Sequence, residues 1–169
     1  MANSLVMVEL QRNSGGGKVL EEIVRIEKKI FPKHESLAKS FEQELKKNNT
    51  GFIYSQQQIV GGGGESESES EITGYVMYSW PSSLYASITK LAVKEKYRGQ
   101  GHGEALLKAA IKKCKTRSIH RISLHVDPSR IPAMNLYKKL GFQVDSLVEC
   151  YYSSDRNAYR MYLDFDSDQ

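Results

Sequence analysis

Cysteine is scarce in this sequence, and its scarcity excludes several classes of protein. Among 169 residues only Cys114 and Cys150 are present, too few for a disulfide scaffold or for a zinc site with Cys/His spacing. No apolar run approaches the roughly 18 residues of a membrane span, and the first residues lack the pattern of a signal peptide. We therefore expect buried thiols, no metal, no membrane, and a cytoplasmic protein that is also compatible with the nucleus.

The residues that are present describe an ordinary globular protein. Hydrophobic residues make up 40% of the chain and charged residues 26%, and this length suits one domain rather than two. A tetraglycine run followed by alternating Ser and Glu, at about residues 61–71, cannot form a core. We expect it to be a flexible loop inside a single domain of residues 1–169.

Charge is unevenly distributed. The net charge is only +4, but ten Lys or Arg residues and two Glu residues lie between Lys90 and Arg121. Such a region favours a polyanionic ligand. It does not favour a nucleic acid, because no recognition motif or aromatic platform accompanies it.

Hydrophobic periodicity predicts seven strands and four helices. Strand patterns occupy residues 6–10, 51–60, 72–80, 86–93, 121–126, 142–152 and 158–163. Helical spacing occupies residues 19–30, 36–47, 103–115 and 131–140, where Gly141 suits the end of the last helix. This order predicts an α/β fold in which a mixed sheet of six or seven strands is flanked by about four helices.

A glycine-rich turn joins the fourth predicted strand to the third helix. Its residues are Arg98, Gly99, Gln100, Gly101, His102 and Gly103. A strand, a glycine turn and a helix N-terminus together can hold a phosphate or pyrophosphate. The pattern lacks the Gly-Lys-Ser/Thr of a P-loop and the G-x-G-x-x-G of a dinucleotide fold.

This R-x-x-G-x-G pattern resembles the signature of the GCN5-related N-acetyltransferase (GNAT) superfamily. His125 in L-H-V, Tyr137 in L-Y-K-K-L-G-F, and the pair Phe31 and Pro32 resemble the protein N-terminal acetyltransferases in particular. The resemblance implies the single-domain GNAT fold, acetyl-CoA as co-substrate, and acetyl transfer to a protein or peptide N-terminus in a ternary complex. It also leaves room for a ribosome or auxiliary subunit as partner.

The resemblance also implies roles for individual residues. Tyr137 would protonate the departing thiolate, and His125 would act as general base. An α-amino group, with a pKa of about 7.7 to 8.0, needs less help from such a base than a lysine at about 10.4. The implied cofactor-binding residues are Leu91, Ala92, Val93, Arg98, Gly99, Gln100, Gly101, His102 and Gly103, and the implied substrate-binding residues are Phe31, Pro32, Tyr151 and Tyr152.

Two departures from the family pattern keep alternatives open. Arg130 follows Ser129 where many relatives have an asparagine, and Ser87 stands where some relatives have a tyrosine. The base is then His125 alone, a water chain or another group. The acceptor alternatives are an internal lysine and a polyamine or other small amine, and a non-catalytic acyl-CoA-binding regulatory module is a further reading. In a continuing strand, Tyr151 and Tyr152 would project to opposite faces.

Overall fold

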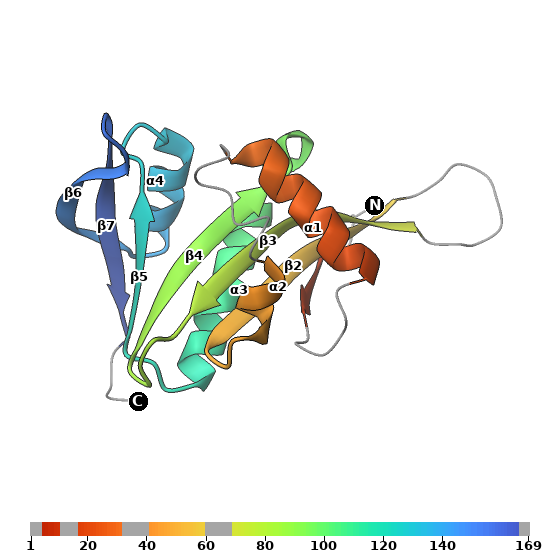
Figure 1. The fold of residues 1–169 in the computed structure, drawn as a ribbon, viewed down its shortest axis with the longest axis horizontal. Coiled ribbons are helices and arrows are strands. Elements are labelled where there is room, and N and C mark those ends of the chain that lie inside the picture. The colour runs from red at the N-terminus through yellow and green to blue at the C-terminus, as the bar shows by residue number, and fades with distance from the viewer. Residues whose placement is uncertain (1–4, 11–16, 32–40, 60–68, 166–169) are drawn as a thin grey trace. The chain divides into compact units, whose positions relative to one another are not determined.

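The computed structural model describes residues 5–10, 17–31, 41–59 and 69–165. Its elements follow the predicted order (Figure 1). They are β1 (Leu5–Glu9), α1 (Gly17–Ile30), α2 (Phe41–Lys46), β2 (Thr50–Ile59), β3 (Glu69–Ser79), β4 (Tyr85–Val93), the 3₁₀ helix η1 (Glu95–Tyr97), α3 (His102–Thr116), β5 (Arg121–Val126), α4 (Ile131–Lys139), β6 (Gln143–Ser153) and β7 (Arg156–Asp164).

The sheet has seven strands in the order β1-β2-β3-β4-β5-β7-β6. β4 and β5 are parallel, while β5 with β7, β6 with β7, and β1 with β2 are antiparallel. The predicted mixed sheet with four helices is therefore confirmed. β3 begins at Glu69, three residues before the predicted strand, and residues 60–68, which hold most of the Gly/Ser/Glu segment, lie outside the described residues.

The chain falls into two compact units. Unit 1 comprises Met1–Met77 and Lys90–Ala110, and unit 2 comprises Tyr78–Thr89 and Ile111–Gln169. Each unit is described by itself below.

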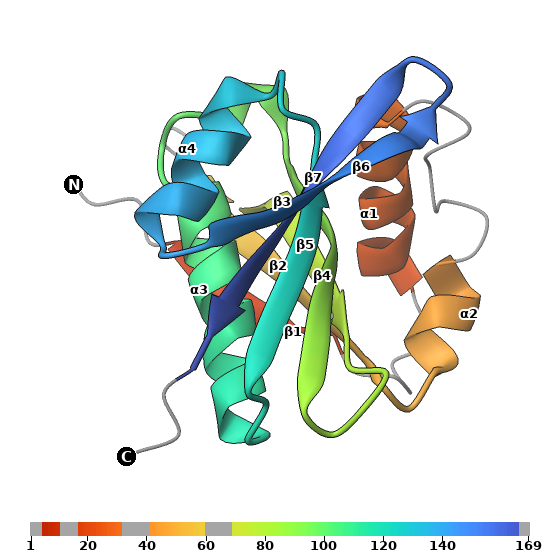
Figure 2. The same cartoon turned by 90° about the vertical axis from the view of Figure 1, so that its left-hand side faces the viewer.

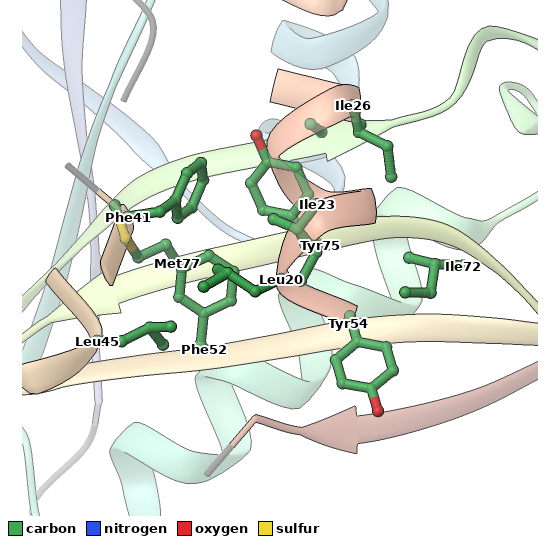
Figure 3. Packing of buried hydrophobic residues seen from close by; sticks show 11 residues of the cluster. Leu20, Ile23, Ile26, Phe41, Leu45, Phe52, Tyr54, Ile72, Tyr75 and Met77 are labelled. Atoms are coloured by element: carbon green, nitrogen blue, oxygen red, sulfur yellow. The ribbon is translucent and has the colours of Figure 1, made fainter. Parts of the chain in front are cut away.

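The core of unit 1 is an aromatic cluster under α1. The rings of Phe41 and Phe52 lie 5.3 Å apart edge to face, and Phe52 stacks on Tyr75 at 5.7 Å. Leu20 and Ile23 of α1 pack against these rings (Figure 3). Apolar residues at helical spacing on α1 thus bury one stripe of the helix, as the sequence predicts.

The core of unit 2 follows from the alternation of β5. Ile122, Leu124 and Val126 are buried, and the residues between them are partly exposed. α4 ends as predicted, since Gly141 has a φ of +98° and the amide of Phe142 donates to the carbonyl of Tyr137 at 3.0 Å. Strand alternation and a helix-ending glycine were readable from the sequence and are both confirmed.

The expectation of two buried thiols is half right. Cys114 is buried, but Cys150 is exposed, because it lies on β6, at the end of the strand order, and has a left-handed φ of +55°. In the described part of the chain, no helix has the length and hydropathy to cross a membrane.

Candidate functional site

The turn between η1 and α3 depends on two glycines of unit 1. Gly99 and Gly101 have φ values of +74° and +87°, in the left-handed region that strains other residues. A Cβ added at either position would meet no described atom within 4 Å, so conformation rather than crowding requires glycine. The amide of Ala105 donates to the carbonyl of Gly101 at 3.0 Å, so the helical hydrogen bonds of α3 begin at Gly101, and the N-terminus of the helix follows the glycine turn directly. This helix terminus can therefore receive an anion.

Side chains of the turn hold its backbone in place. Arg98 Nε donates to the carbonyl of Val93 at 3.1 Å, and Gln100 Nε2 donates to the carbonyl of Lys96 at 3.0 Å. Both residues are exposed. These side chains therefore stabilise the turn by binding backbone carbonyls of the residues just before it.

His102, the first residue of α3, has a buried side chain. Its Nδ1 is hydrogen-bonded to Thr73 Oγ1 at 2.8 Å, and Thr73 Oγ1 shares a hydrogen bond of 2.6 Å with Ser55 Oγ. The imidazole stacks on Tyr97 at 5.3 Å, and burial lowers its pKa. The ring therefore anchors the turn to β3. The polar Ser55 and Thr73 within apolar strands were the sequence signal for this chain of hydrogen bonds.

A network of charges lies on the flank of the same turn. Glu71 bridges to Lys94 at 3.2 Å and to Lys96 at 2.8 Å, and it accepts a hydrogen bond from the Tyr97 hydroxyl. Burial raises the pKa of Glu71, but the hydrogen bonds from Lys96, Tyr97 and Lys94 outweigh it and bring the pKa down to about 2. Glu71 was expected in the flexible loop, and its place in β3 gives two of the basic residues an acidic partner.

The strand before the turn approaches β3 closely. Ala92 is buried, and Leu91 and Val93 are partly buried. A Cβ added to Gly74 would lie 2.4 Å from the Ala92 carbonyl oxygen and 3.1 Å from Val93 Cα. Glycine at position 74 therefore permits the backbones of β3 and β4 to come together here.

Phe31 directly follows α1, and its ring lies under a buried ion pair. Lys90 Nζ is 3.7 Å from the centroid of the Phe31 ring and 3.7 Å from Glu27 Oε1. Glu27 is fully buried and accepts a hydrogen bond from the Tyr75 hydroxyl. These contacts hold the end of α1 on β4, whereas Pro32 lies outside the described residues.

In unit 2, His125 projects from β5 on the face opposite its buried neighbours, as predicted. Its ring stacks on Tyr151 with centroids 4.3 Å apart and planes 8° apart. Burial lowers the pKa of His125, and the charge of Arg160, its cross-strand partner on β7, lowers it further. The imidazole is therefore neutral at neutral pH.

Tyr151 and Tyr152 do not alternate across the strand, so that expectation is wrong. Their rings meet edge to face at 4.8 Å and 87°. The register of β6 with β7 shifts between Val148 and Ser153, and Cys150 has left-handed backbone, which together break the alternation that a regular strand imposes. Tyr151 is exposed, and burial raises the pKa of the partly buried Tyr152 to about 12.

Tyr137 lies on α4 with its ring edge to face with Phe142 at 6.0 Å. It is 8% exposed, and burial raises its pKa to about 12, although the charge of Arg130 opposes the rise. The charge of Arg130 also opposes the rise in the pKa of Tyr152. Tyr137 is therefore a protonated phenol in the same group of unit 2 side chains as the paired tyrosines.

Ser87, one of the two departures from the family pattern, has a local partner, and so does Ser129, which precedes the other departure, Arg130. Ser87 Oγ and Ser123 Oγ lie 3.2 Å apart across β4 and β5. The amide and hydroxyl of Ser129 both donate to Asp127 Oδ1, at 2.9 and 2.7 Å. Asp127 also binds Arg156, a contact that sequence reasoning missed. The turn-forming Asp-Pro-Ser sequence was its only local signal.

Among the described residues, no group of three or more His, Cys, Asp or Glu side chains has the arrangement of a metal site.

Two archaeal proteins named N-alpha-acetyltransferase are similar to this chain in sequence. The N-alpha-acetyltransferase of Sulfurisphaera tokodaii is 35% identical over 108 residues, which are 57% of this chain and 65% of that protein. The N-alpha-acetyltransferase of Sulfolobus acidocaldarius is 29% identical over 154 residues, 84% of each chain. The chain thus spans slightly less than two thirds of the length of the S. tokodaii protein.

The solved structure of Arabidopsis thaliana NAA60 in complex with acetyl-CoA has a similar fold. Its TM-score is 0.76 at 20% identity, over 96% of this chain and 99% of that chain. Residues 20–142 match the acetyltransferase (GNAT) family, which covers the glycine turn, His125 and Tyr137. This chain therefore belongs to the GNAT family of acetyltransferases, which use acetyl-CoA.

Proposed function

We propose that this chain transfers the acetyl group of acetyl-CoA to the α-amino group of a protein or peptide N-terminus. The observation that carries the proposal is the stack of neutral His125 on Tyr151. It joins a proton acceptor to an exposed aromatic surface that can receive a peptide. The relatives named N-alpha-acetyltransferase support the same acceptor.

The donor would bind at the glycine turn. Backbone amides of the turn and of the first residues of α3 would hold the pyrophosphate, because the positive end of the helix dipole favours an anion. Main-chain groups of Leu91, Ala92 and Val93 would hold the pantetheine. The residues proposed for the turn are Arg98, Gly99, Gln100, Gly101, His102 and Gly103. His102 would contribute its amide only, since its ring is engaged by Thr73 and Tyr97.

Two side chains of opposite character would manage the protons. His125, whose pKa is lowered, would accept a proton from the acceptor amine through a ring nitrogen. Tyr137, whose pKa is raised to about 12, would keep its proton until the thiolate departs. Bound acetyl-CoA supplies the acetyl thioester. Environments that separate two pKa values in this way are typical of acid and base assignments.

The acceptor would lie against the aromatic side chains. Tyr151 and Tyr152 of unit 2 are proposed to contact the first residues of the peptide, and Phe31 and Pro32 of unit 1 are proposed as further substrate-binding residues. A ribosome-bound or auxiliary-subunit partner belongs to the same proposal. A mild base suits an α-amino group better than an internal lysine, because the lysine pKa is about 10.4.

The test measures CoA release from acetyl-CoA with a library of peptides that have free N-termini. Matched peptides with blocked N-termini and one free lysine run beside them, as do polyamines. We expect turnover with free N-termini only. Turnover confined to lysine or to polyamines would overturn the proposed acceptor, and binding of acetyl-CoA without any turnover would indicate a regulatory module instead.

A further inference from the structure

The aromatic pair of unit 2 belongs to a series of side-chain contacts that runs from His125 to Asp127. His125 stacks on Tyr151, and Tyr151 meets Tyr152 edge to face at 4.8 Å. The guanidinium of Arg156 lies 4.8 Å from the centroid of the Tyr152 ring. Arg156 in turn binds Asp127, which follows β5 two residues after His125. The two residues at the ends of this series, His125 and Asp127, both lie at the C-terminal end of β5.

The contact between Arg156 and Asp127 has the geometry of a firm anchor. Arg156 Nη2 and Nε both donate to Asp127 Oδ2, at 3.0 and 3.2 Å. The other carboxylate oxygen accepts from the amide and hydroxyl of Ser129. Because both oxygens of Asp127 are held, its position is set by the turn after β5. The planar guanidinium, fixed by Asp127, then packs on the face of Tyr152 and restrains that ring.

This region needs side-chain anchors because the strand ladder is irregular here. The register of β6 with β7 shifts between Val148 and Ser153, and Cys150 between them has a φ of +55°. A regular ladder would fix where each side chain projects. The ladder does not fix the directions of Tyr151 and Tyr152, so contacts with other side chains must hold them.

We propose that Arg156 is a positioning residue for the acceptor-binding tyrosines. It joins Asp127 to Tyr152, and Tyr152 in turn supports the Tyr151 ring that stacks on His125. This inference rests on the proposed function. Arg156 does not touch reacting atoms. Its loss would loosen the acceptor-binding tyrosines and leave binding of the donor unchanged.

The opposite end of the same strands supplies a matched control. Arg121 Nε and Nη2 donate to the two oxygens of Asp164 at 2.5 and 2.9 Å. The Arg121 guanidinium lies 4.4 Å from the centroid of the Tyr162 ring. Both sets therefore join an arginine to an aspartate and a tyrosine. Figure 2 shows the three strands of this unit that carry them, β5, β6 and β7. Only the Arg156 set includes neighbours of His125.

The experiment compares Arg156→Met, Arg156→Lys and Arg121→Met in the full chain. For each variant, steady-state kinetics give KM for the best acceptor peptide, KM for acetyl-CoA, and kcat. Hydrogen exchange followed by mass spectrometry reports on residues 148–158. The exchange measurement needs no acceptor, so it tests the anchor independently of the proposed function.

For Arg156→Met we expect the peptide KM to rise about tenfold, as for a misplaced binding group, with acetyl-CoA KM unchanged and faster exchange at residues 148–158. Arg156→Lys should recover part of both effects, because lysine keeps the charge without the planar fork. Arg121→Met should leave the peptide KM and this exchange as in the wild type.

Other results overturn the inference. Equal peptide KM in Arg156→Met and the wild type would do so, as would equal effects in Arg156→Met and Arg121→Met. Unchanged exchange at residues 148–158 would do so even in a protein that acetylates no peptide. A wild-type chain that binds acetyl-CoA but turns over no peptide, with faster exchange in Arg156→Met, would overturn the proposed function while supporting the anchor.

Discussion

Burial moves the pKa values of two candidate side chains in opposite directions. It lowers the pKa of His125, and it raises the pKa of Tyr137 to about 12. The low-dielectric environment disfavours the charged form of each group, which is imidazolium in one and phenolate in the other. One physical cause therefore favours a neutral imidazole and a protonated phenol at neutral pH, the states that the proposed function requires.

Replacing Tyr137 by Phe tests the donor role. If the phenol protonates the thiolate, kcat should fall about a hundredfold, while the far-UV spectrum and the melting temperature stay near those of the wild type. Tyr162→Phe on β7 is the control, since Tyr162 contacts Arg121 rather than the candidate site. A kcat within twofold of the wild type would mean that Tyr137 only packs.

The pH dependence of kcat/KM tests His125. A base must be neutral, so activity should fall as the pH drops through the pKa of His125. Because burial and Arg160 lower that pKa, the acidic limb should lie below the ordinary histidine value of about 6.5. His125→Gln should lose this limb. A limb that persists in this variant would assign the titration to another group.

At the scale of elements, α1 is joined to β4 by a buried ion pair. Glu27 is fully buried and Lys90 nearly so, with 14% of its side chain exposed. Removing one member of a buried pair leaves the other charge without compensation and typically costs about 3 to 5 kcal/mol. The pair is therefore a point at which unit 1 is sensitive to substitution.

Glu27→Leu should lower the free energy of unfolding by about 3 kcal/mol, as measured by urea denaturation. The control is Lys108→Gln, which breaks the exposed Lys108–Glu104 bridge of 3.1 Å on α3 and should cost about 0.5 kcal/mol at most. Equal unfolding midpoints for these two variants would contradict the importance of the buried pair.

Two glycines of unit 1 should respond differently to alanine. Gly74→Ala drives a Cβ to 2.4 Å from the Ala92 carbonyl oxygen, so β3 and β4 must separate, at about 1 to 3 kcal/mol. Gly99→Ala meets open space but has a φ of +74°, which costs about 1 to 2 kcal/mol.

Thermal unfolding of both variants separates the two causes. Serine in place of alanine should worsen the effect at position 74, where space is the limit. At position 99 asparagine should recover stability, since it tolerates left-handed backbone. A stable Gly74→Ala variant would contradict the close approach of the two strands.

At the scale of the whole molecule, the positive charge of residues 90–121 is partly neutralised by acidic residues from elsewhere in the sequence. Lys94 and Lys96 bind Glu71, and Lys90 lies beside Glu27. Arg121 is paired with Asp164. These acids come from distant parts of the sequence, so counting charges between residues 90 and 121 overstated the local field.

The sequence predicted what local patterns determine. β5 has the predicted ends, and Gly141 ends α4 as expected. Contacts between remote residues were not predictable, because one sequence does not record which polar side chains meet. The bonds of Tyr75 to Glu27 and of Arg156 to Asp127 span 48 and 29 residues.

The irregular end of β6 was also missed, because no glycine marks the left-handed backbone at Cys150. The site residues themselves came from the resemblance to a family. Their roles and the single-domain boundaries stay predictions.

The central claim is that the acceptor is an α-amino group, and the most direct test is to locate the acetyl group on one peptide. The peptide carries a free N-terminus and one internal lysine, and it is analysed by fragment mass spectrometry after incubation with the chain and acetyl-CoA. The account predicts acetylation of the α-amino group, reduced in Tyr137→Phe and His125→Gln, with the lysine unmodified. A peptide that is acetylated on its lysine while its N-terminus stays unmodified would contradict the account.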